Sequence, residues 1–156
     1  MFQQLKIIGV VLLLASTSLK AKESGLLTFK SEYSTTETLT RLKASLAKKQ
    51  FKVFSHIDHS AGAKSNNISL RDTQLVIFGN PKVGSKLMQC NQTIAIDLPQ
   101  KVLIWIDADG STWLAFNNPN YLFQRHQLKE CQQIITKITK VLTAIAKDVT
   151  QKGSEQ

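Results

Sequence analysis

The chain has 156 residues, about the length of one ordinary domain. Hydrophobic residues make up 42% and charged residues 20% of it, so the composition is that of a folded globular protein and excludes a disordered chain. The formal net charge of +9 is compatible with an acidic surface or anionic ligand as partner, although a solvated surface with excess lysine is the favoured interpretation. Because the lysines are scattered and no aromatic motif is interleaved with them, we expect no nucleic-acid binding.

The first 21 residues differ from the rest of the chain. A positively charged start precedes an apolar run from Ile7 to Leu14, and small residues follow up to Ala21. This order predicts a secretory signal peptide over residues 1–21, cleaved after Ser18 or Ala21. The apolar run is shorter than the roughly 20 residues of a membrane-spanning helix, although a retained anchor is the alternative. We therefore expect a periplasmic or secreted protein with no permanent membrane span.

Two cysteines remain after signal cleavage, Cys90 and Cys131. In an oxidising compartment such a pair favours a disulfide, and two separately buried thiols are the alternative. Neither cysteine lies in a Cys-x-x-Cys or Cys-x-x-His motif, so the spacing indicates no thiol-redox or zinc site. We expect neither a metal nor a cofactor.

The mature chain begins with strand and helix patterns in alternation. Residues 26–33 are a candidate first strand. Ser34 and Glu37 have the spacing of a capping box, which predicts that a helix begins there. Residues 51–58 alternate as a second strand. The apolar stripe of the predicted helix consists of Leu39, Leu42 and Leu46.

The second half of the chain is richer in strands. Residues 60–70 are polar and predict a short helix or loop. Three further strands are expected over 75–78, 101–106 and 112–116. Asp109-Gly110 predicts a hairpin between the last two. One helix is expected to begin at Asn118-Pro119 and a long one to span 128–149. The apolar face expected for the long helix is Ile134, Ile138, Val141, Ile145 and Val149.

These elements predict an α+β fold. We expect a mostly antiparallel five-stranded sheet with an early β-α-β unit and helices packed on it, including a long C-terminal helix. A single domain would cover residues 22–149, followed by a flexible tail over 150–156. Central strands that are apolar on both faces need a second cover, which a homodimer, the C-terminal helix or an apolar ligand could provide. We favour the homodimer.

Several motifs occur in an order that resembles one protein family. They are His56–Ala63, Leu70–Thr73, Val76–Lys82, Leu87–Gln89, Ile96–Lys101, Val102–Trp105 with Asp107–Gly110, and Asn118–Leu122 with Arg125–His126. Over about residues 30–128 the chain resembles a DUF302 domain. The resemblance implies a small TBP-like domain with helices against a sheet, often dimeric and without a settled activity.

The chain departs from the family pattern in three places. Gln50 stands where a glycine usually ends the first helix. Cys90 replaces a small residue, and the helix that carries Cys131 extends past the usual end of the domain. The last two departures suggest a Cys90–Cys131 disulfide that the family does not require.

The family motifs supply a candidate ligand site of seven side chains. They are His59, Arg71, Asn80, Met88, Asp97, Lys101 and His126. A histidine can act as acid, base or ligand near neutral pH, and an arginine can bind a carboxylate or phosphate. In the competing interpretation these side chains only hydrogen-bond one another or loop carbonyls.

Three functions remain open from the sequence. The favoured one is a non-catalytic domain that binds a small molecule or a partner beside the block of residues 78–101. The second is a small hydrolase or isomerase using His59 with Arg71 or Asp97, although the chain has no recognised catalytic motif. The third is copper or haem handling through histidine, methionine and Cys90.

Overall fold

The computed structural model describes residues 25–153, so the predicted signal peptide lies outside the described residues. The strands are β1 (Leu26–Ser31), β2 (Lys52–Asp58), β3 (Thr73–Gly79), β4 (Gln100–Ile106) and β5 (Thr112–Asn117). The α-helices are α1 (Thr35–Lys48), α2 (His59–Ser65), α3 (Pro81–Cys90), α4 (Pro119–Arg125) and α5 (Gln132–Thr150). Two 3-10 helices are η1 (Gln92–Asp97) and η2 (Lys129–Cys131).

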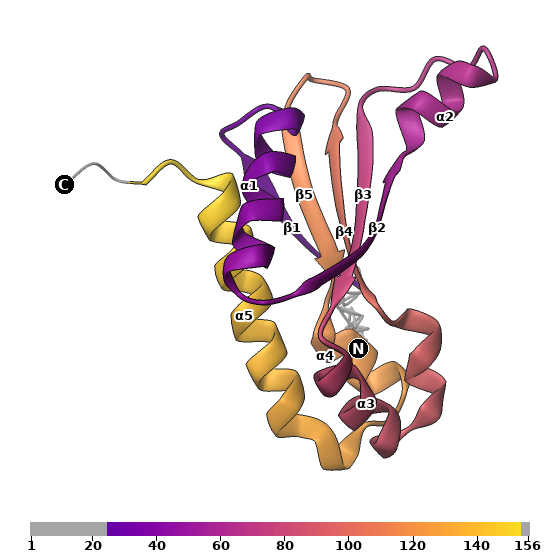
Figure 1. The fold of residues 1–156 in the computed structure, drawn as a ribbon, viewed down its shortest axis with the longest axis vertical. Helices are drawn as coiled ribbons and strands as arrows, with labels where there is room; N and C mark the ends of the chain where they lie inside the picture. The colour runs from indigo at the N-terminus through magenta and orange to yellow at the C-terminus, as the bar shows by residue number, and fades with distance from the viewer. Residues whose placement is uncertain (1–24, 154–156) are drawn as a thin grey trace, which may run out of the picture.

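The five strands form one sheet in the order β1-β5-β4-β3-β2 (Figure 1). Every neighbouring pair is antiparallel. The predicted α+β class, the five-stranded sheet and the early β-α-β unit are therefore confirmed. The two strands that flank α1 lie at opposite edges of the sheet, so the connection from β1 through α1 to β2 crosses one face.

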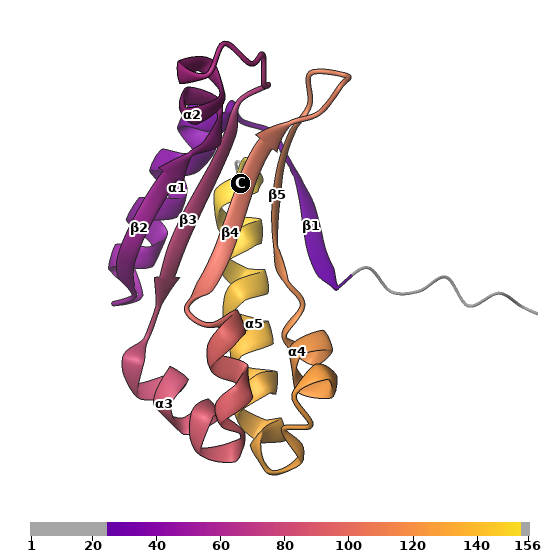
Figure 2. The same ribbon diagram turned by 90° about the vertical axis from the view of Figure 1, so that its right-hand side faces the viewer.

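The main core lies between the sheet and two helices. Leu42 and Leu46 of α1 are fully buried, as the apolar stripe predicted. They pack in one cluster with Leu142 and Ile145 of α5 and with the inner side chains of β3, β4 and β5. The long C-terminal helix is confirmed, but it lies on the same face as α1 and does not cover the second face (Figure 2).

The buried stripe of α5 differs from the expected one. Ile145 and Val149 are buried as expected, but Val141 is 38% exposed. The buried side chains of α5 are instead Ile135, Leu142, Ile145, Ala146, Val149 and Thr150. The difference arises because the N-terminal half of α5 runs past the end of the sheet, where it packs beside α4 (Figure 2) and where Ile135 belongs to a cluster with Leu87 of α3.

Helix α3 follows β3 directly, in a segment for which the sequence pattern predicted no helix. The side chain of Asn80 accepts hydrogen bonds from the backbone N–H groups of Lys82 and Val83, and Pro81 occupies the first turn. These are standard features of a helix start. Leu87 of α3 belongs to a second, smaller core with Ile94, Leu128 and Ile135.

The face of the sheet opposite α1 and α5 has no helix over its central strands in the described part of the chain (Figure 2). It carries half-buried Leu75, Leu103, Trp105 and Trp113. The two tryptophan rings stack with their centroids 6.4 Å apart. Between residues 25 and 153, no helix combines the length and the apolar character that crossing a membrane requires.

Candidate ligand-binding groove

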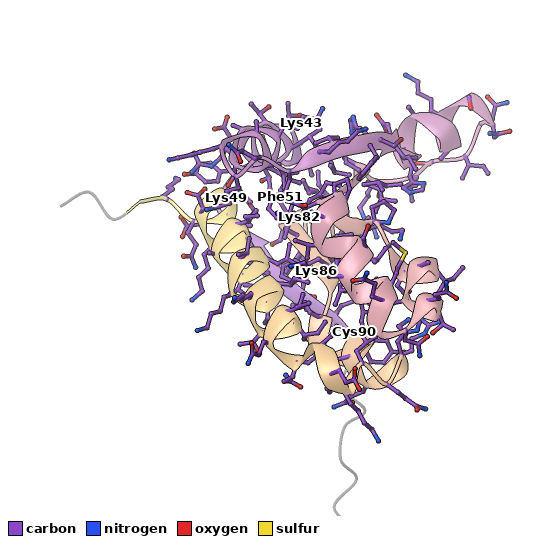
Figure 3. All side chains as sticks on the ribbon, turned by 60° about the horizontal axis from the view of Figure 1, so that its bottom comes forward. Lys43, Lys49, Phe51, Lys82, Lys86 and Cys90 are labelled. Atoms are coloured by element: carbon purple, nitrogen blue, oxygen red, sulfur yellow. A yellow bond between two sulfur atoms is a disulfide. The ribbon has the colours of Figure 1, made fainter. Side chains whose placement is uncertain are left out.

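A groove of about 610 Å³ lies between the two cores. Phe51, Ile138 and Leu142 reach it from the main core, and Leu87 and Met88 reach it from the second core. Figure 3 looks toward this end of the molecule, where α3 and α5 run side by side. The lining is mostly apolar, and pockets of this size and character are typical of small-molecule sites.

The groove stays open because the side of α3 that faces it carries small residues. Gly84 and Ser85 both line it. A Cβ atom added at Gly84 would meet only Leu98, at 3.8 Å. Small side chains at these two positions leave space that longer side chains would occupy. The sequence at this point therefore favours a cavity rather than a packed core.

Besides Asn80 and Ser85, two lysines and a glutamine add polar groups to this apolar lining. Lys86 of α3 and Lys137 of α5 line opposite walls and are exposed. Gln100 lines the groove from the start of β4 and is 9% exposed, and its Oε1 atom has no hydrogen-bond partner. No Asp or Glu lines the groove. The local electrostatic potential is therefore positive.

Two of the seven predicted site residues line this groove. Asn80 and Met88 do so, at the start and in the last turn of α3. The groove residues that sequence reasoning missed are Gln100, Lys86, Lys137 and the apolar side chains of α5. The available signal was the wide apolar face of α5, which is broader than contact with the sheet alone needs.

Asp97 and His126 form a polar clamp behind the groove. The His126 Nε2 atom lies 2.5 Å from Asp97 Oδ2, and the His126 side chain is 5% exposed. His126 Nδ1 lies 3.0 Å from Thr93 Oγ1, and the Asn91 amide donates to the His126 carbonyl at 2.9 Å. The clamp ties η1 to the end of α4.

The order hydroxyl, imidazole, carboxylate also occurs in hydrolytic triads. Here the Thr93 hydroxyl lies 2.9 Å from Asn91 Oδ1, an acceptor, so its only proton has a partner other than the imidazole. The Thr93 hydroxyl is therefore not committed to the imidazole as a nucleophile is to its base. The arrangement fits a structural hydrogen-bond network better than an activated nucleophile.

Lys101 holds the corner that leads from η1 into β4. Its Nζ atom donates to the carbonyls of Asp97 and Pro99, at 3.3 and 3.2 Å. The Leu98–Pro99 peptide bond within this corner is cis. Both Leu98 and Pro99 line the groove. Lys101 therefore shapes one wall of the groove.

Cys90 and Cys131 are joined in a disulfide, with their Cα atoms 6.4 Å apart. The bond links the end of α3 to the segment just before α5. It therefore fixes the two helices that form the groove walls. It also removes the Cys90 thiolate from the copper site considered above. Among residues 25–153, no group of three His, Cys, Asp or Glu side chains is placed to hold a metal.

His59 and Arg71 lie at the other end of the sheet. His59 begins α2, and the Arg71 Nε atom donates to the Ile106 carbonyl at 3.1 Å. The groove and Asp97 lie beyond the opposite end of β3, about 20 Å away at 3.3 Å per strand residue. The structure therefore does not bring His59 or Arg71 together with Asp97.

Near His59, Asp58 caps α2. Ser60 Oγ and the Ala61 backbone N–H donate to Asp58 Oδ1, at 2.6 and 2.8 Å. These hydrogen bonds favour the charged carboxylate and lower the pKa of Asp58 from 3.8 to about 2. In the β4–β5 turn, the hydrogen bond from the Trp113 indole likewise lowers the pKa of Asp107. Both aspartates have structural roles.

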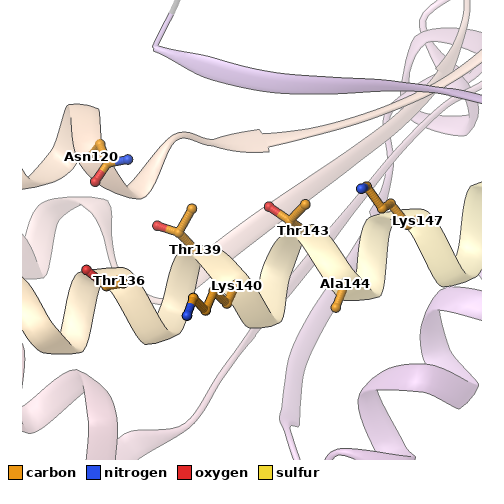
Figure 4. Close-up of a pocket in the computed structure, with 7 residues that line it drawn as sticks. All are labelled: Asn120, Thr136, Thr139, Lys140, Thr143, Ala144 and Lys147. Atoms are coloured by element: carbon orange, nitrogen blue, oxygen red, sulfur yellow. The ribbon is translucent and has the colours of Figure 1, made fainter.

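A second hollow of about 530 Å³ lies on the outer side of α5 (Figure 4). Its side chains come from one face of α5, apart from Asn120 of α4. Thr136 and Thr139 in its wall already donate to carbonyls of their own helix, at 3.0 and 2.9 Å. This hollow lies against the face of a single helix, whereas the groove has walls from α3, α5 and the start of β4, so the groove is the candidate site.

The fold and the groove define a small α+β domain with helices on one face of its sheet and a cross-linked helical end. Residues 27–145 match the family described as "Domain of unknown function DUF302", and the chain belongs to this family. The crystal structure of an uncharacterized conserved protein DUF302 from Bacillus stearothermophilus has the same fold, with a TM-score of 0.73. The two sequences are 20% identical, and the structural match covers 81% of this chain and 98% of the Bacillus stearothermophilus chain.

Curated relatives are longer proteins. Fluoride-specific ion channel FluC 1 of Brucella suis is 45% identical over 106 residues, which are 68% of this chain and 42% of the relative. Fluoride-specific ion channel FluC 2 of Brucella melitensis matches with the same identity over 39% of its length. The chain thus spans about two fifths of these relatives, and the channel names belong to the longer proteins.

Proposed function

We propose that the protein is an exported, non-catalytic domain that binds an apolar small molecule in the groove between α3 and α5. The observation that carries this proposal is the 610 Å³ groove itself. Its walls are apolar although solvent reaches it, as exposed Phe54 and Val141 show. Covering such side chains with an apolar ligand yields about 25 cal/mol per Å² of surface removed from water.

A non-catalytic role fits the contacts of the candidate catalytic residues. His126 and Asp97 are bound to each other, and Lys101 is bound to backbone carbonyls. Arg71 is bound to the backbone of β4 at the other end of the sheet. A catalytic site would bring such groups to one cleft with a free position for substrate. These contacts support binding over the hydrolase or isomerase alternative.

Binding can be tested with the neutral fluorescent probe N-phenylnaphthylamine. The wild-type protein is expected to enhance and saturate its fluorescence. Gly84→Phe places an aromatic ring in the groove and is expected to abolish the enhancement. Gly62→Phe is the matched control, because Gly62 lies on α2 with nothing within 4 Å of its added Cβ. Equal probe binding by both variants would place the probe elsewhere and overturn the proposal.

Export is supported by the disulfide, because such bonds persist in oxidising compartments. The signal-like order of residues 1–21 supports it as well. Sequencing the N-terminus of the protein recovered from its native host tests the proposal. A chain beginning at Leu19 or Lys22 supports cleavage, and a chain that retains Phe2 contradicts it.

A second copy of the chain is the proposed partner for the face of the sheet opposite α1 and α5, which would give a homodimer. Half-buried Leu103, Trp105 and Trp113 give this face an apolar centre. Tryptophan is enriched in the centres of protein interfaces. Two copies related by a two-fold axis would present the same patch to each other and cover both.

A further inference from the structure

We propose that the groove accommodates a hydroxylated anionic amphiphile, of the chemical class of the hydroxy fatty acids. Its carboxylate would lie at Lys86 and Lys137, its acyl chain along the apolar walls, and its hydroxyl group at Gln100. This inference rests on the proposed function, because it requires that the groove bind an apolar molecule.

The two lysines supply the site for the anion. They extend from opposite walls, Lys86 from α3 and Lys137 from α5. Figure 3 shows Lys86 between the two helices. Neither lysine forms an ion pair within the described residues, and no acid in the groove lining competes for them. A carboxylate at the mouth would therefore neutralise two unpaired positive charges.

Gln100 supplies the second requirement. Its backbone is paired with Phe78 in the sheet, and the residue lines the groove. The side chain is 9% exposed, and Oε1 is buried without a partner. A buried acceptor without a donor is destabilising, so a ligand that brings a donor gains from meeting it. A carboxylate cannot donate a hydrogen bond, whereas a hydroxyl group can.

The two unpaired lysines, the unpaired Gln100 acceptor and the apolar lining together restrict the class of ligand. A small inorganic anion would leave the apolar walls in water and Gln100 unpaired. A neutral hydrocarbon would leave the lysines and Gln100 unpaired. An acyl chain with a carboxylate at one end and a hydroxyl group toward the other would cover the apolar walls, pair with the lysines and donate to Gln100.

The test is displacement of N-phenylnaphthylamine by ω-hydroxylaurate, laurate and lauryl alcohol. In the wild type, ω-hydroxylaurate is expected to displace the probe about fivefold better than laurate, since one hydrogen bond accounts for a factor of this size. Lys86→Gln with Lys137→Gln should weaken both acids about fivefold and leave the alcohol unchanged. Lys43→Gln with Lys64→Gln removes the same charge away from the groove and should change nothing.

Gln100→Leu and Gln100→Met should erase the advantage of ω-hydroxylaurate over laurate while still binding the probe. Two variants are used so that a folding defect in one does not decide the result. If the wild type binds the probe but all three compounds displace it equally, and the lysine variant changes nothing, this inference is wrong while the proposed function stands. If the wild type does not bind the probe, the proposed function itself is wrong.

Discussion

Asp97 and His126 are held 2.5 Å apart although they come from different elements, η1 and the end of α4. Arg125 adds a longer contact, with Nη1 3.6 Å from Asp97 Oδ1. The imidazole is nearly buried and the guanidinium is half exposed. The clamp therefore depends on the histidine more than on the arginine.

The first prediction concerns this clamp. Asp97→Ala and His126→Ala are each expected to lower the free energy of unfolding by about 1–3 kcal/mol, because each leaves the other partner without its hydrogen bond. The double variant should lose less than the sum of the two by at least about 1 kcal/mol. Urea unfolding of the four proteins measures this coupling. Arg125→Ala is the control, and its free energy of unfolding is expected to fall by no more than about 0.5 kcal/mol. If the losses for Asp97→Ala and His126→Ala were additive, the two residues would not be coupled and the clamp would be refuted.

The second prediction concerns the Cys90–Cys131 disulfide. Replacing both cysteines by serine is expected to cost about 2–4 kcal/mol, because the bond restricts the unfolded chain. Thermal unfolding of this variant and of the reduced wild type should give similar lower Tm values. Alkylation of the native protein should label neither cysteine before reduction. Labelling without reduction would show free thiols and contradict the disulfide.

The third prediction concerns acid stability through Asp58. The folded-state pKa of Asp58 is about 2 against an ordinary 3.8, so the folded protein binds a proton less readily than the unfolded chain does. The resulting stabilisation is present above about pH 4 and is lost as the pH falls toward 2. Asp58→Asn keeps a capping side chain but does not titrate, so its stability should fall less over this range. Carbon-detected NMR titration measures the pKa directly, and a value near 3.8 would contradict the prediction.

The fourth prediction concerns Gln50, which follows α1 with a φ of 57°. A left-handed conformation costs an L-residue roughly 1–2 kcal/mol, whereas glycine adopts it freely. Gln50→Gly is therefore expected to raise the stability by about 1 kcal/mol, and Gln50→Val to lower it. Chemical unfolding measures both variants. A loss of stability with glycine would show that the Gln50 side chain contributes more than its backbone strain costs.

The fifth prediction tests the homodimer. Leu103→Asp places a charge at the centre of the open sheet face and is expected to give a monomer. Light scattering coupled to gel filtration measures the mass. Thr36→Asp on the exposed side of α1 is the control and should leave the mass of the dimer unchanged. A monomeric wild type at high protein concentration would exclude the proposed dimer.

Much of the fold could be predicted because local signals agreed with the tertiary structure. Ser34 accepts from the Glu37 backbone N–H as the capping motif predicted, and Asn118 caps α4. The Asp-Gly signal lies in the β4–β5 turn, where Gly110 has a φ of 79°. Each of these features is decided by a few neighbouring residues. Sequence spacing is sufficient for such features.

The groove could not be predicted in the same way. Helix α3 was missed because Gly79-Asn80-Pro81 fits a turn as well as a helix start, and only the capping bonds of Asn80 distinguish them. The placement of Lys86 and Lys137 on one groove depends on how α3 and α5 are arranged, which no local pattern specifies. The motif residues did predict structure, since Asp97, Lys101 and His126 hold the surrounding corner together.

The placement of β1 has a consequence for when the domain can fold. Leu27 of β1 pairs with Phe116 of β5, so the first strand finds its partner only after most of the chain is available. Pairings between distant segments are slow to form, because the chain must close a long loop first. When only β1 and α1 have been synthesised, β1 has no β5 strand to pair with. The sheet therefore cannot be completed until β5 has been synthesised.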